Sequence, residues 1–305
     1  MHDESQIDFE TLLAGAALRV EAMLDALLGA HPLPGELARP ERLLAAMRHG
    51  VLNGGKRLRP FLVLESAALF GADGEAILRV AAALECVHSY SLVHDDLPAM
   101  DDDDLRRGQP TVHRAFDEAA AILAGDALLT LAFDIIADPA TELSAEARVA
   151  LISKLARAAG IGGMVGGQAL DLAAERDTPD EAGIIRLQAM KTGALIRFAC
   201  EAGAIAAGAP QGDVERLAEF GSAIGLAFQL ADDLLDHSST PEAMGKATGK
   251  DAAAGKGTLV ALHGEAWARR QLGGLVAQAC ELIAPYGDRA VILMATARFV
   301  AERDR

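Results

Sequence analysis

The feature that most constrains this chain is a helical spacing of apolar residues that continues almost from end to end. In residues 9–28, apolar side chains recur every three to four positions and mark one face of a helix. Strand-like alternation is nearly absent from the sequence. The same spacing predicts helices over 41–52, 60–70, 75–97, 114–137, 144–159, 180–207, 213–236, 264–284 and 288–303. The sequence therefore predicts an all-α fold.

Several of these segments are apolar almost all the way round, notably 75–94, 114–133 and 194–207. Helices of this kind are buried inside a large bundle, because a surface helix keeps a polar face. The 305 residues contain no long linker, low-complexity tail or short-period repeat. We therefore predict a single all-helical domain over residues 1–305.

The charge balance excludes one class of partner. The chain has 28 basic and 44 acidic residues, a formal net charge of −16. A protein that binds nucleic acid along its phosphates needs a basic stripe, and the sequence has none. The acidic residues are also unevenly placed, since six of the 44 fall between positions 95 and 104.

Three further features predict a cytoplasmic protein without a membrane span. Cys86, Cys200 and Cys280 are odd in number and far apart, which suits reduced thiols in the cytosol. Residues 1–6 are polar and acidic, unlike a signal peptide. We also expect charged residues to interrupt every apolar run before about 18 residues, the length that a membrane span needs.

The first of two aspartate clusters, at 95–104, follows the apolar helix predicted over 75–97. Pro98 disfavours helical geometry at Leu97, so the helix should end there. The chain could then fold Asp101 back beside Asp95. Carboxylate oxygens of this kind suit Mg²⁺, which takes one or two carboxylates together with substrate phosphates.

The second cluster, Asp232-Asp233-Leu234-Leu235-Asp236, lies at the end of the helix predicted over 213–236. Asp232 and Asp236 are one turn apart on the same face, and they repel unless a cation lies between them. The alternative is a solvent-exposed acidic helix end, which the helix dipole disfavours. Two such clusters together indicate a divalent-metal site.

Cationic residues accompany the clusters. Arg106 and Arg107 directly follow the first one, and Lys56, Arg57 and Arg59 lie within residues 53–60. Arginine binds phosphate oxygens through two parallel hydrogen bonds, and lysine acts as a point charge. For Arg106 and Arg107 the alternative is local charge neutralisation. That alternative does not explain the preceding Gly54-Gly55, which would let the backbone approach a ligand closely.

Other catalytic patterns are missing from the sequence or incomplete in it. Residues 50–56 nearly match a nucleotide-binding P-loop, but Arg57 stands where Ser or Thr must hold the metal and no strand precedes it. The glycine run 160–167 lacks dinucleotide-binding spacing, so it predicts close helix packing or a helix break. His88 and His94 are the histidines nearest the first cluster, and a lone histidine is more often structural.

Together these residues resemble the trans-prenyltransferase (polyprenyl synthase) family, with bacterial-type farnesyl diphosphate synthases as the nearest members. The resemblance begins near residue 40 and rests on five ordered blocks: 54–60, 88–101 with its DDxxxxD spacing, 105–108, 191–195 and 228–236. It implies a single large helical bundle around a deep central cavity, a homodimer, and three Mg²⁺ ions, with Mn²⁺ as a substitute.

The resemblance also implies a role for each matched residue. Asp95 and Asp101 would bind two metal ions and Asp232 the third, with Asp96 and Asp236 supporting them. The allylic diphosphate would be held by Arg106, Lys191 and Lys246. Isopentenyl diphosphate would be held by Gly55, Lys56, Arg59, His88 and Arg107. Lys191 (through its carbonyl), Thr192 and Gln229 would lie beside the developing carbocation.

The implied activity is Mg²⁺-dependent condensation of isopentenyl diphosphate with dimethylallyl or geranyl diphosphate to give farnesyl diphosphate. Tyr90, five residues before Asp95, would block further growth of the product. The alternative is that Tyr90 is simply a core aromatic residue. Other interpretations are a geranyl or geranylgeranyl diphosphate synthase, a non-catalytic partner subunit, and an acidic divalent-cation buffer. The sequence departs from the family pattern after Lys246 and at Gly257.

Overall fold

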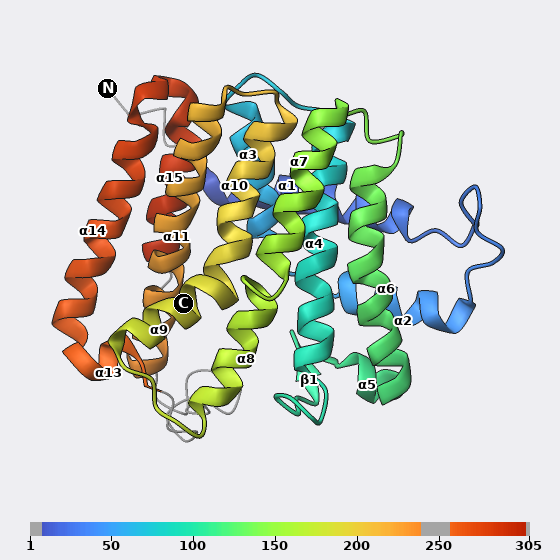
Figure 1. Cartoon of the computed structure of the whole chain (residues 1–305), viewed down its shortest axis with the longest axis horizontal. Coiled ribbons are helices and arrows are strands. Elements are labelled where there is room, and N and C mark those ends of the chain that lie inside the picture. Colours follow the sequence, from blue (N-terminus) through green and yellow to red (C-terminus); the bar gives the residue numbers. More distant parts are fainter. Residues whose placement is uncertain (1–7, 239–256, 303–305) are drawn as a thin grey trace. The chain divides into compact units, whose positions relative to one another are not determined.

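The computed structural model describes residues 8–238 and 257–302 (Figure 1). In the described part of the chain the structure is helical except for one two-stranded hairpin, so the all-α prediction is confirmed. The helices form two compact units, Met1–Ile152 and Ser153–Arg305. A single domain over 1–305 stays a prediction.

The first unit is built around α4 (Glu75–Asp95), which packs against four other helices of the same unit. Ala81, Ala82 and Ala83 on α4 are fully buried, and such small side chains let neighbouring helices approach closely. The elements around α4 are α1 (Phe9–Leu27), α2 (Glu41–Val51), α3 (Leu58–Ala68), β1 (Leu105–Arg106), β2 (Gln109–Pro110), α5 (Val112–Ala115) and α6 (Glu118–Ala137). The predicted burial of the segment 75–94 is confirmed.

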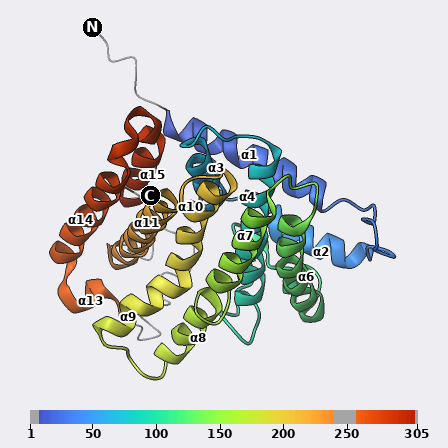
Figure 2. The ribbon, with the colours of Figure 1, turned by 45° about the horizontal axis from the view of Figure 1, so that its top comes forward.

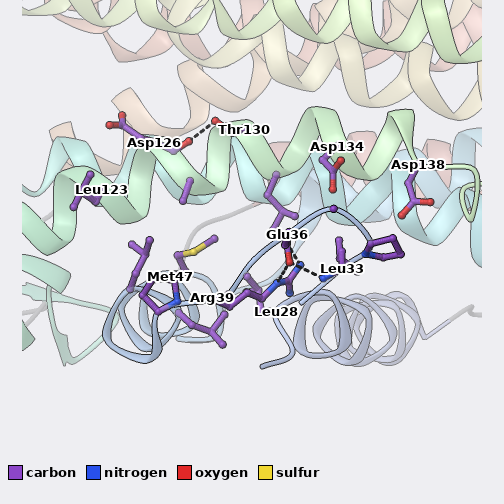
Figure 3. Close-up of a pocket in the computed structure, with 18 of the residues that line it drawn as sticks. Leu28, Leu33, Glu36, Arg39, Met47, Leu123, Asp126, Thr130, Asp134 and Asp138 are labelled. Atoms are coloured by element: carbon purple, nitrogen blue, oxygen red, sulfur yellow. Dashed lines mark hydrogen bonds and ion pairs between the residues drawn. The ribbon is translucent and has the colours of Figure 1, made fainter. Parts of the chain in front are cut away.

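The first unit also contains a cavity of about 1000 Å³ between α6 and the segment that leads into α2 (Figure 3). Leu123 and Asp126 of α6 line one side, and Leu33, Arg39 and Met47 line the other. The residues that line it include none of the predicted site residues. The deep central cavity implied by the resemblance therefore stays a prediction.

The second unit is built around α11 (Gln211–Ser238), which runs beside α10 (Ala194–Ala206) and also packs on α14 (Glu265–Ile283) and α15 (Val291–Ala301) (Figure 2). A Cβ atom on Gly225 would lie 2.8 Å from the Cα atom of Gly193, so a glycine is needed at this helix crossing. The other elements are α8 (Met164–Ala174), α9 (Glu181–Gln188), a π-helical turn (Ala189–Gly193), α13 (Leu259–His263) and a 3₁₀ helix (Ala284–Ala290). The helix α7 (Ala145–Ala159) contains the boundary between the two units.

The helices differ from the predicted ones most clearly in three places. The segment 114–137 is split, because Asp117 leaves helical geometry and its Oδ1 accepts from Ala120 N at 2.7 Å to cap α6. The segment 180–207 is interrupted by the π-helical turn. The helix α8 was not predicted, since the glycine run 160–167 hides its start. That run does separate α7 from α8, and Gly167 packs against the backbone of Lys191.

Charged residues do interrupt the apolar runs, but the expectation that they exclude a membrane span by length and composition was wrong. Three described helical stretches are long and apolar enough to cross a membrane by length and composition: Glu75–Asp95, Glu118–Ala137 and Ala145–Ala174. In the α6 stretch, the isolated charges of Asp126 and Asp134 are too few to lower the average hydropathy. In α4 the apolar window is 72% buried, so its apolar surface is used for packing within the protein.

Candidate active site

The first aspartate cluster forms a compact turn directly after α4. The helix ends at Asp95, and Asp101 N then donates a hydrogen bond to Asp95 O at 2.8 Å. Asp103 N donates to Asp96 O at 3.2 Å, which closes the turn further. Asp102 has the left-handed backbone that such a reversal requires, with φ of 51°. The predicted fold-back of Asp101 beside Asp95 is therefore confirmed.

The carboxylates of this turn do not share one environment. Asp95 is half-buried and Asp101 is exposed, whereas Asp96 is buried. Arg106, on β1, donates from Nε to Asp96 Oδ1 at 2.7 Å. Burial raises the pKa of Asp96, and the hydrogen bond from Arg106 opposes that rise. Arg106 thus neutralises Asp96, as the charge-neutralisation alternative proposed, and its diphosphate-binding role stays a prediction.

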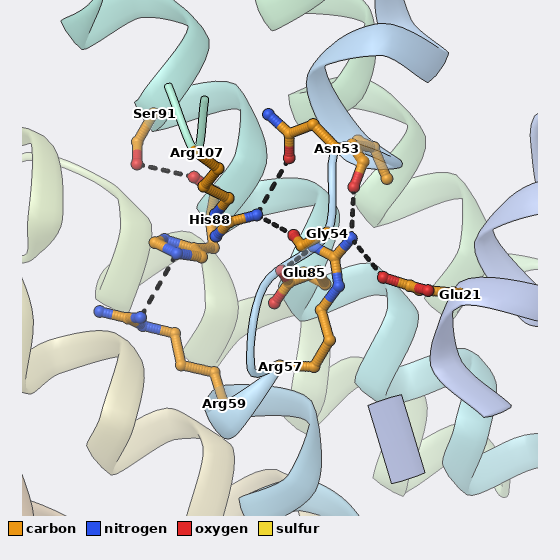
Figure 4. A network of polar contacts seen from close by, with 10 residues as sticks. Glu21, Asn53, Gly54, Arg57, Arg59, Glu85, His88, Ser91 and Arg107 are labelled. Carbon is orange, nitrogen blue, oxygen red and sulfur yellow. Dashed lines mark hydrogen bonds and ion pairs between the residues drawn. The ribbon is translucent and has the colours of Figure 1, made fainter. Parts of the chain in front are cut away.

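Arg57 is a structural residue of the loop between α2 and α3 (Figure 4). Its backbone is left-handed, with φ of 49°, and its guanidinium points into the protein. Nη1 donates to Glu85 Oε1 at 2.5 Å, and Nη2 donates to Val51 O at 2.5 Å. The neighbouring basic residues differ, since Lys56 of the loop is exposed and Arg59, in the first turn of α3, is half-buried.

Arg107 is held against the glycine pair of the same loop (Figure 4). Its Nη1 donates to Asn53 Oδ1 at 3.0 Å and to Gly54 O. Gly55 has φ of 122°, and a Cβ atom there would lie 2.6 Å from Arg107 Cζ. The sequence predicted that the glycines admit a ligand to the backbone. In the structure, the group that fills the space beside Gly55 is the Arg107 guanidinium, and a side chain at position 55 would collide with it.

His88 joins Arg59 and Arg107 in this cluster (Figure 4). Its Nε2 lies 3.4 Å from Arg59 Nη1. Burial, followed by the charges of Arg59 and Arg107, holds the pKa of His88 well below its usual value, so the ring is neutral at pH 7. The structure thus brings together Gly55, Arg59, His88 and Arg107, with Lys56 adjacent in the chain. A neutral imidazole among guanidinium groups leaves several donors for an anion.

Tyr90 and His94 lie one turn apart on α4, and their rings meet edge to face with centroids 5.8 Å apart. Tyr90 is buried, and burial together with the charge of Asp95 raises its pKa to about 12. His94 Nε2 lies 3.0 Å from Ile122 O, in a space that Gly125 of α6 leaves open. His94 is therefore a packing residue, as expected for a lone histidine.

In the second unit, Lys191 and Thr192 lie in the π-helical turn. Turns of this kind are rare and are frequent at functional sites. Lys191 Nζ donates to Asp171 Oδ2 at 2.7 Å, and Asp171 on α8 is buried. Sequence analysis missed Asp171, because α8 itself was not predicted.

Thr192 also begins a chain of hydrogen bonds that ends in α11. Its Oγ1 donates to Gln229 Oε1 at 3.0 Å, and Gln229 Nε2 donates to Asp233 Oδ1 at 3.1 Å. Gln188 Nε2 donates to the other oxygen, Asp233 Oδ2, at 2.8 Å. The structure therefore connects two predicted residues, Thr192 and Gln229, directly. It also links them to Asp233 and Gln188 by contacts that the sequence did not reveal.

A further residue that the sequence analysis missed is Gln168 on α8. Both polar atoms of its amide are buried, and neither has a hydrogen-bond partner in the described part of the chain. Buried amides are normally paired, so an unpaired one needs an explanation. No sequence signal identified Gln168, because a single glutamine after a glycine run has no distinctive spacing.

The second aspartate cluster lies in the last turns of α11. Asp232 is half-buried, Asp236 is exposed, and their one-turn spacing places them on the same helix face. Among the described residues, no group of three or more His, Cys, Asp or Glu side chains is arranged to hold a metal ion. Each cluster nevertheless offers the hard carboxylate oxygens that Mg²⁺ accepts together with phosphate oxygens. Lys246 lies outside the described residues.

Comparison with known proteins shows what this chain is similar to. A family described as polyprenyl synthetase matches residues 40–279. Farnesyl diphosphate synthase of Escherichia coli is 46% identical over 269 residues, which are 86% of this chain and 90% of that protein. Geranylgeranyl diphosphate synthase of Cyanophora paradoxa is 42% identical over 267 residues, 87% of this chain and 89% of that protein. The crystal structure of an FPP/GFPP synthase from Zymomonas mobilis is 44% identical, with a TM-score of 0.85, and covers 97% of this chain and 99% of its own.

Proposed function

Because this chain belongs to the polyprenyl synthetase family and is a prenyltransferase, we propose that it condenses isopentenyl diphosphate with dimethylallyl or geranyl diphosphate. The products would be farnesyl diphosphate and free diphosphate. The observation that carries the proposal is the 2.8 Å hydrogen bond from Asp101 N to Asp95 O, which holds two carboxylate-bearing residues side by side at the end of α4. That arrangement suits a metal-bound diphosphate.

The proposed metal ligands are Asp95, Asp101 and Asp232, with Asp96 and Asp236 in support. Mg²⁺ bound there would neutralise the charge of the diphosphate leaving group. The oxygen chemistry of these side chains fits Mg²⁺, and Mn²⁺ as a substitute. Three ions are part of this proposal. Arg106, Lys191 and Lys246 would hold the allylic diphosphate and further offset its charge.

The chain's own residues then bind and orient the second substrate. Arg59, Arg107 and Lys56 would pair with isopentenyl diphosphate, and the neutral His88 would add a hydrogen bond. The C1–O bond of the allylic substrate breaks with its electron pair leaving on the diphosphate. The double bond of isopentenyl diphosphate supplies the electrons of the new C–C bond, and the departed diphosphate takes up the released proton. Oxygen atoms of Lys191, Thr192 and Gln229 would stabilise the cation between these steps.

The farnesyl chain length rests on Tyr90. Its side chain is buried on α4, one to two turns before Asp95 in the direction away from the metal cluster. A product growing along α4 from Asp95 would meet the phenol ring. Relatives named for geranylgeranyl diphosphate make a longer product the second candidate.

The test is to incubate the purified protein with isopentenyl and allylic diphosphates, with and without Mg²⁺, and to identify the prenyl alcohols after phosphatase treatment. We expect farnesol as the main product, only when the metal is present. If geranylgeraniol or geraniol is the main product, the proposed chain length is wrong but the proposed condensation stands. If no product forms under any condition, the proposed condensation fails, and a non-catalytic partner subunit becomes the better interpretation. Asp101→Asn provides the metal-site control.

We propose that the protein is a homodimer that associates through α6. Ile122 and Leu123 of this helix are 46% and 55% exposed, although α6 is among the most apolar helices of the chain. Exposed apolar residues that lie together mark interaction surfaces. Light scattering after size-exclusion chromatography should give twice the mass of one chain, and Leu123→Glu should give the mass of one chain. A monomeric wild-type protein would overturn the proposal. The cytoplasmic location stays a prediction.

A further inference from the structure

Asp233 is a buried carboxylate with a position unlike that of its neighbours in the second aspartate cluster. It is 8% exposed, whereas Asp236 is exposed to solvent. Successive residues of an α-helix are turned by about 100°, so Asp233 does not share the face of Asp232 and Asp236. Asp233 lies instead one turn after Gln229, on the same face as that residue. It therefore meets the hydrogen-bond network of the π-helical turn.

Both oxygens of Asp233 accept hydrogen bonds from glutamine amides. Gln229 Nε2 donates to Oδ1 at 3.1 Å, and Gln188 Nε2 donates to Oδ2 at 2.8 Å. An ionised carboxylate only accepts hydrogen bonds, whereas an amide has one end that donates and one that accepts. Asp233 Oδ1 can therefore accept from Gln229 only when that amide turns its nitrogen toward the carboxylate. The orientation of the Gln229 amide follows from this contact.

The orientation of Gln229 in turn determines what Thr192 can do. Because the nitrogen of the amide faces Asp233, Gln229 Oε1 faces Thr192 and accepts its hydroxyl hydrogen at 3.0 Å. The threonine hydroxyl has a single hydrogen, and this contact uses it. The lone pairs of Thr192 Oγ1 are then the part of the hydroxyl left for a ligand. A reversed amide would use a lone pair and turn the hydroxyl hydrogen outward.

The hydrogen bonds from Thr192 to Gln229 and from Gln229 to Asp233 form a relay. We propose that Asp233 is a positioning residue that sets the direction of this relay, so that Thr192 presents oxygen lone pairs to the allylic cation. The inference rests on the proposed function, in which Thr192 lies beside that cation. A preorganised dipole with its negative end toward developing positive charge lowers the barrier to ionisation. Asp233 acts through Gln229 and Thr192 and touches no substrate itself. Its role therefore differs from that of the metal-binding aspartates in the same cluster.

The variant Asp233→Asn tests the direction of the relay. An asparagine keeps the size of the side chain but has one accepting oxygen, so it cannot accept from both Gln188 and Gln229. We expect kcat for farnesyl diphosphate formation to fall about 10- to 100-fold. The KM for both diphosphates and the Mg²⁺ concentration for half-maximal rate should stay within about twofold, because no substrate or metal contact changes.

A double-mutant cycle with Thr192→Val shows whether Asp233 acts through the hydroxyl. In the Thr192→Val background the relay has no hydroxyl to orient, so adding Asp233→Asn should slow kcat by less than about twofold. Gln188→Met is the matched control, because it removes the hydrogen bond to the other oxygen of the same carboxylate, Asp233 Oδ2, and leaves the Gln229 contact in place. Its kcat should stay within about twofold of wild type. Glu201→Gln, at another buried carboxylate of the second unit, controls for general loss of stability.

The outcomes separate this inference from the proposed function. The positioning role would be overturned if Asp233→Asn kept the wild-type kcat or needed more Mg²⁺. It would also be overturned if Asp233→Asn lowered kcat equally in the Thr192→Val background. A wild-type protein that forms no prenyl product would overturn the proposed function instead. If Asp233→Asn does not fold, Gln229→Met breaks the relay and keeps the Gln188 contact. It should lower kcat to the same extent, and unchanged kcat would refute the relay.

Discussion

The guanidinium of Arg107 occupies the space that a side chain on Gly55 would need, with Arg107 Cζ 2.6 Å from the position of an added Cβ atom. The two residues lie far apart in the sequence, yet the Arg107 guanidinium can lie where it does only because Gly55 has no side chain.

Gly55→Ala should displace Arg107 and weaken binding of isopentenyl diphosphate. We expect the KM for this substrate to rise about 10- to 100-fold, since a small displacement of a binding group is costly. Gly54→Ala is the matched control, because Gly54 also has positive φ (82°) but has open space around its Cβ position. Both variants should lose about 1–2 kcal/mol of stability from the backbone conformation. Steady-state kinetics would contradict the prediction if both variants had the same KM.

Replacing Tyr90 with alanine should lengthen the product beyond fifteen carbons. The phenol ring is buried before Asp95 on α4, and its removal opens space along the helix. Tyr90→Phe, which keeps the ring, should keep the wild-type product. Chromatography of the prenyl alcohols measures the length. A destabilised Tyr90→Ala protein that still makes only the wild-type product would show that Tyr90 is a core aromatic residue.

His88 should make the protein less stable in mild acid. Its pKa in the folded protein lies well below the usual value, so below about pH 6.5 the unfolded chain binds a proton that the folded protein does not. The free energy of unfolding therefore falls as the pH drops through this range. Denaturant titrations at about pH 7.5 and 5.5 measure this change. Between these two pH values, the free energy of unfolding should fall less for His88→Gln than for wild type. The exposed His31, changed to Gln, should leave the fall unchanged.

Breaking the ion pair between Arg57 and Glu85 should destabilise the first unit strongly. The two side chains are 1% and 2% exposed, so Glu85→Gln removes the buried countercharge of Arg57 and leaves only the half-buried Glu21, 3.3 Å from Arg57 Nη2. We expect a loss of about 3–5 kcal/mol in the free energy of unfolding. Asp73→Asn breaks the exposed pair with Arg19 and should cost less than about 1 kcal/mol. Equal losses in urea titrations would show that the Arg57 pair contributes little.

Local chemistry predicted the parts of the site that depend on a few consecutive residues. Pro98 predicted the end of α4 and the return of Asp101 to Asp95, because proline restricts the residue before it whatever the rest of the chain does. The one-turn spacing of Asp232 and Asp236 likewise follows from helix geometry alone. The glycine run also predicted a helix break, which lies at Gly160–Gly163, but the helix α8 after it was not predicted.

The same reasoning could not separate three arginines that look alike in the sequence. Arg57, Arg59 and Arg107 all follow or adjoin glycines in the sequence, yet Arg57 is buried against Glu85 while the other two lie beside His88. Which of them is structural depends on contacts with residues from other helices. Asp233 is a similar case, since its neighbour Gln229 is local but Gln188 comes from α9.

The sequence by itself determined the helical class, the turn that holds the first aspartate cluster, the one-turn spacing of the second, and the family. These features depend on backbone preferences and periodicity within a few turns of the chain. Only the tertiary structure decided which charges are paired, that Gly55 makes room for Arg107, and that Asp233 faces two glutamines. The physical reason is that burial and hydrogen-bond direction are set by side chains from distant segments, and periodicity along one segment carries no information about them.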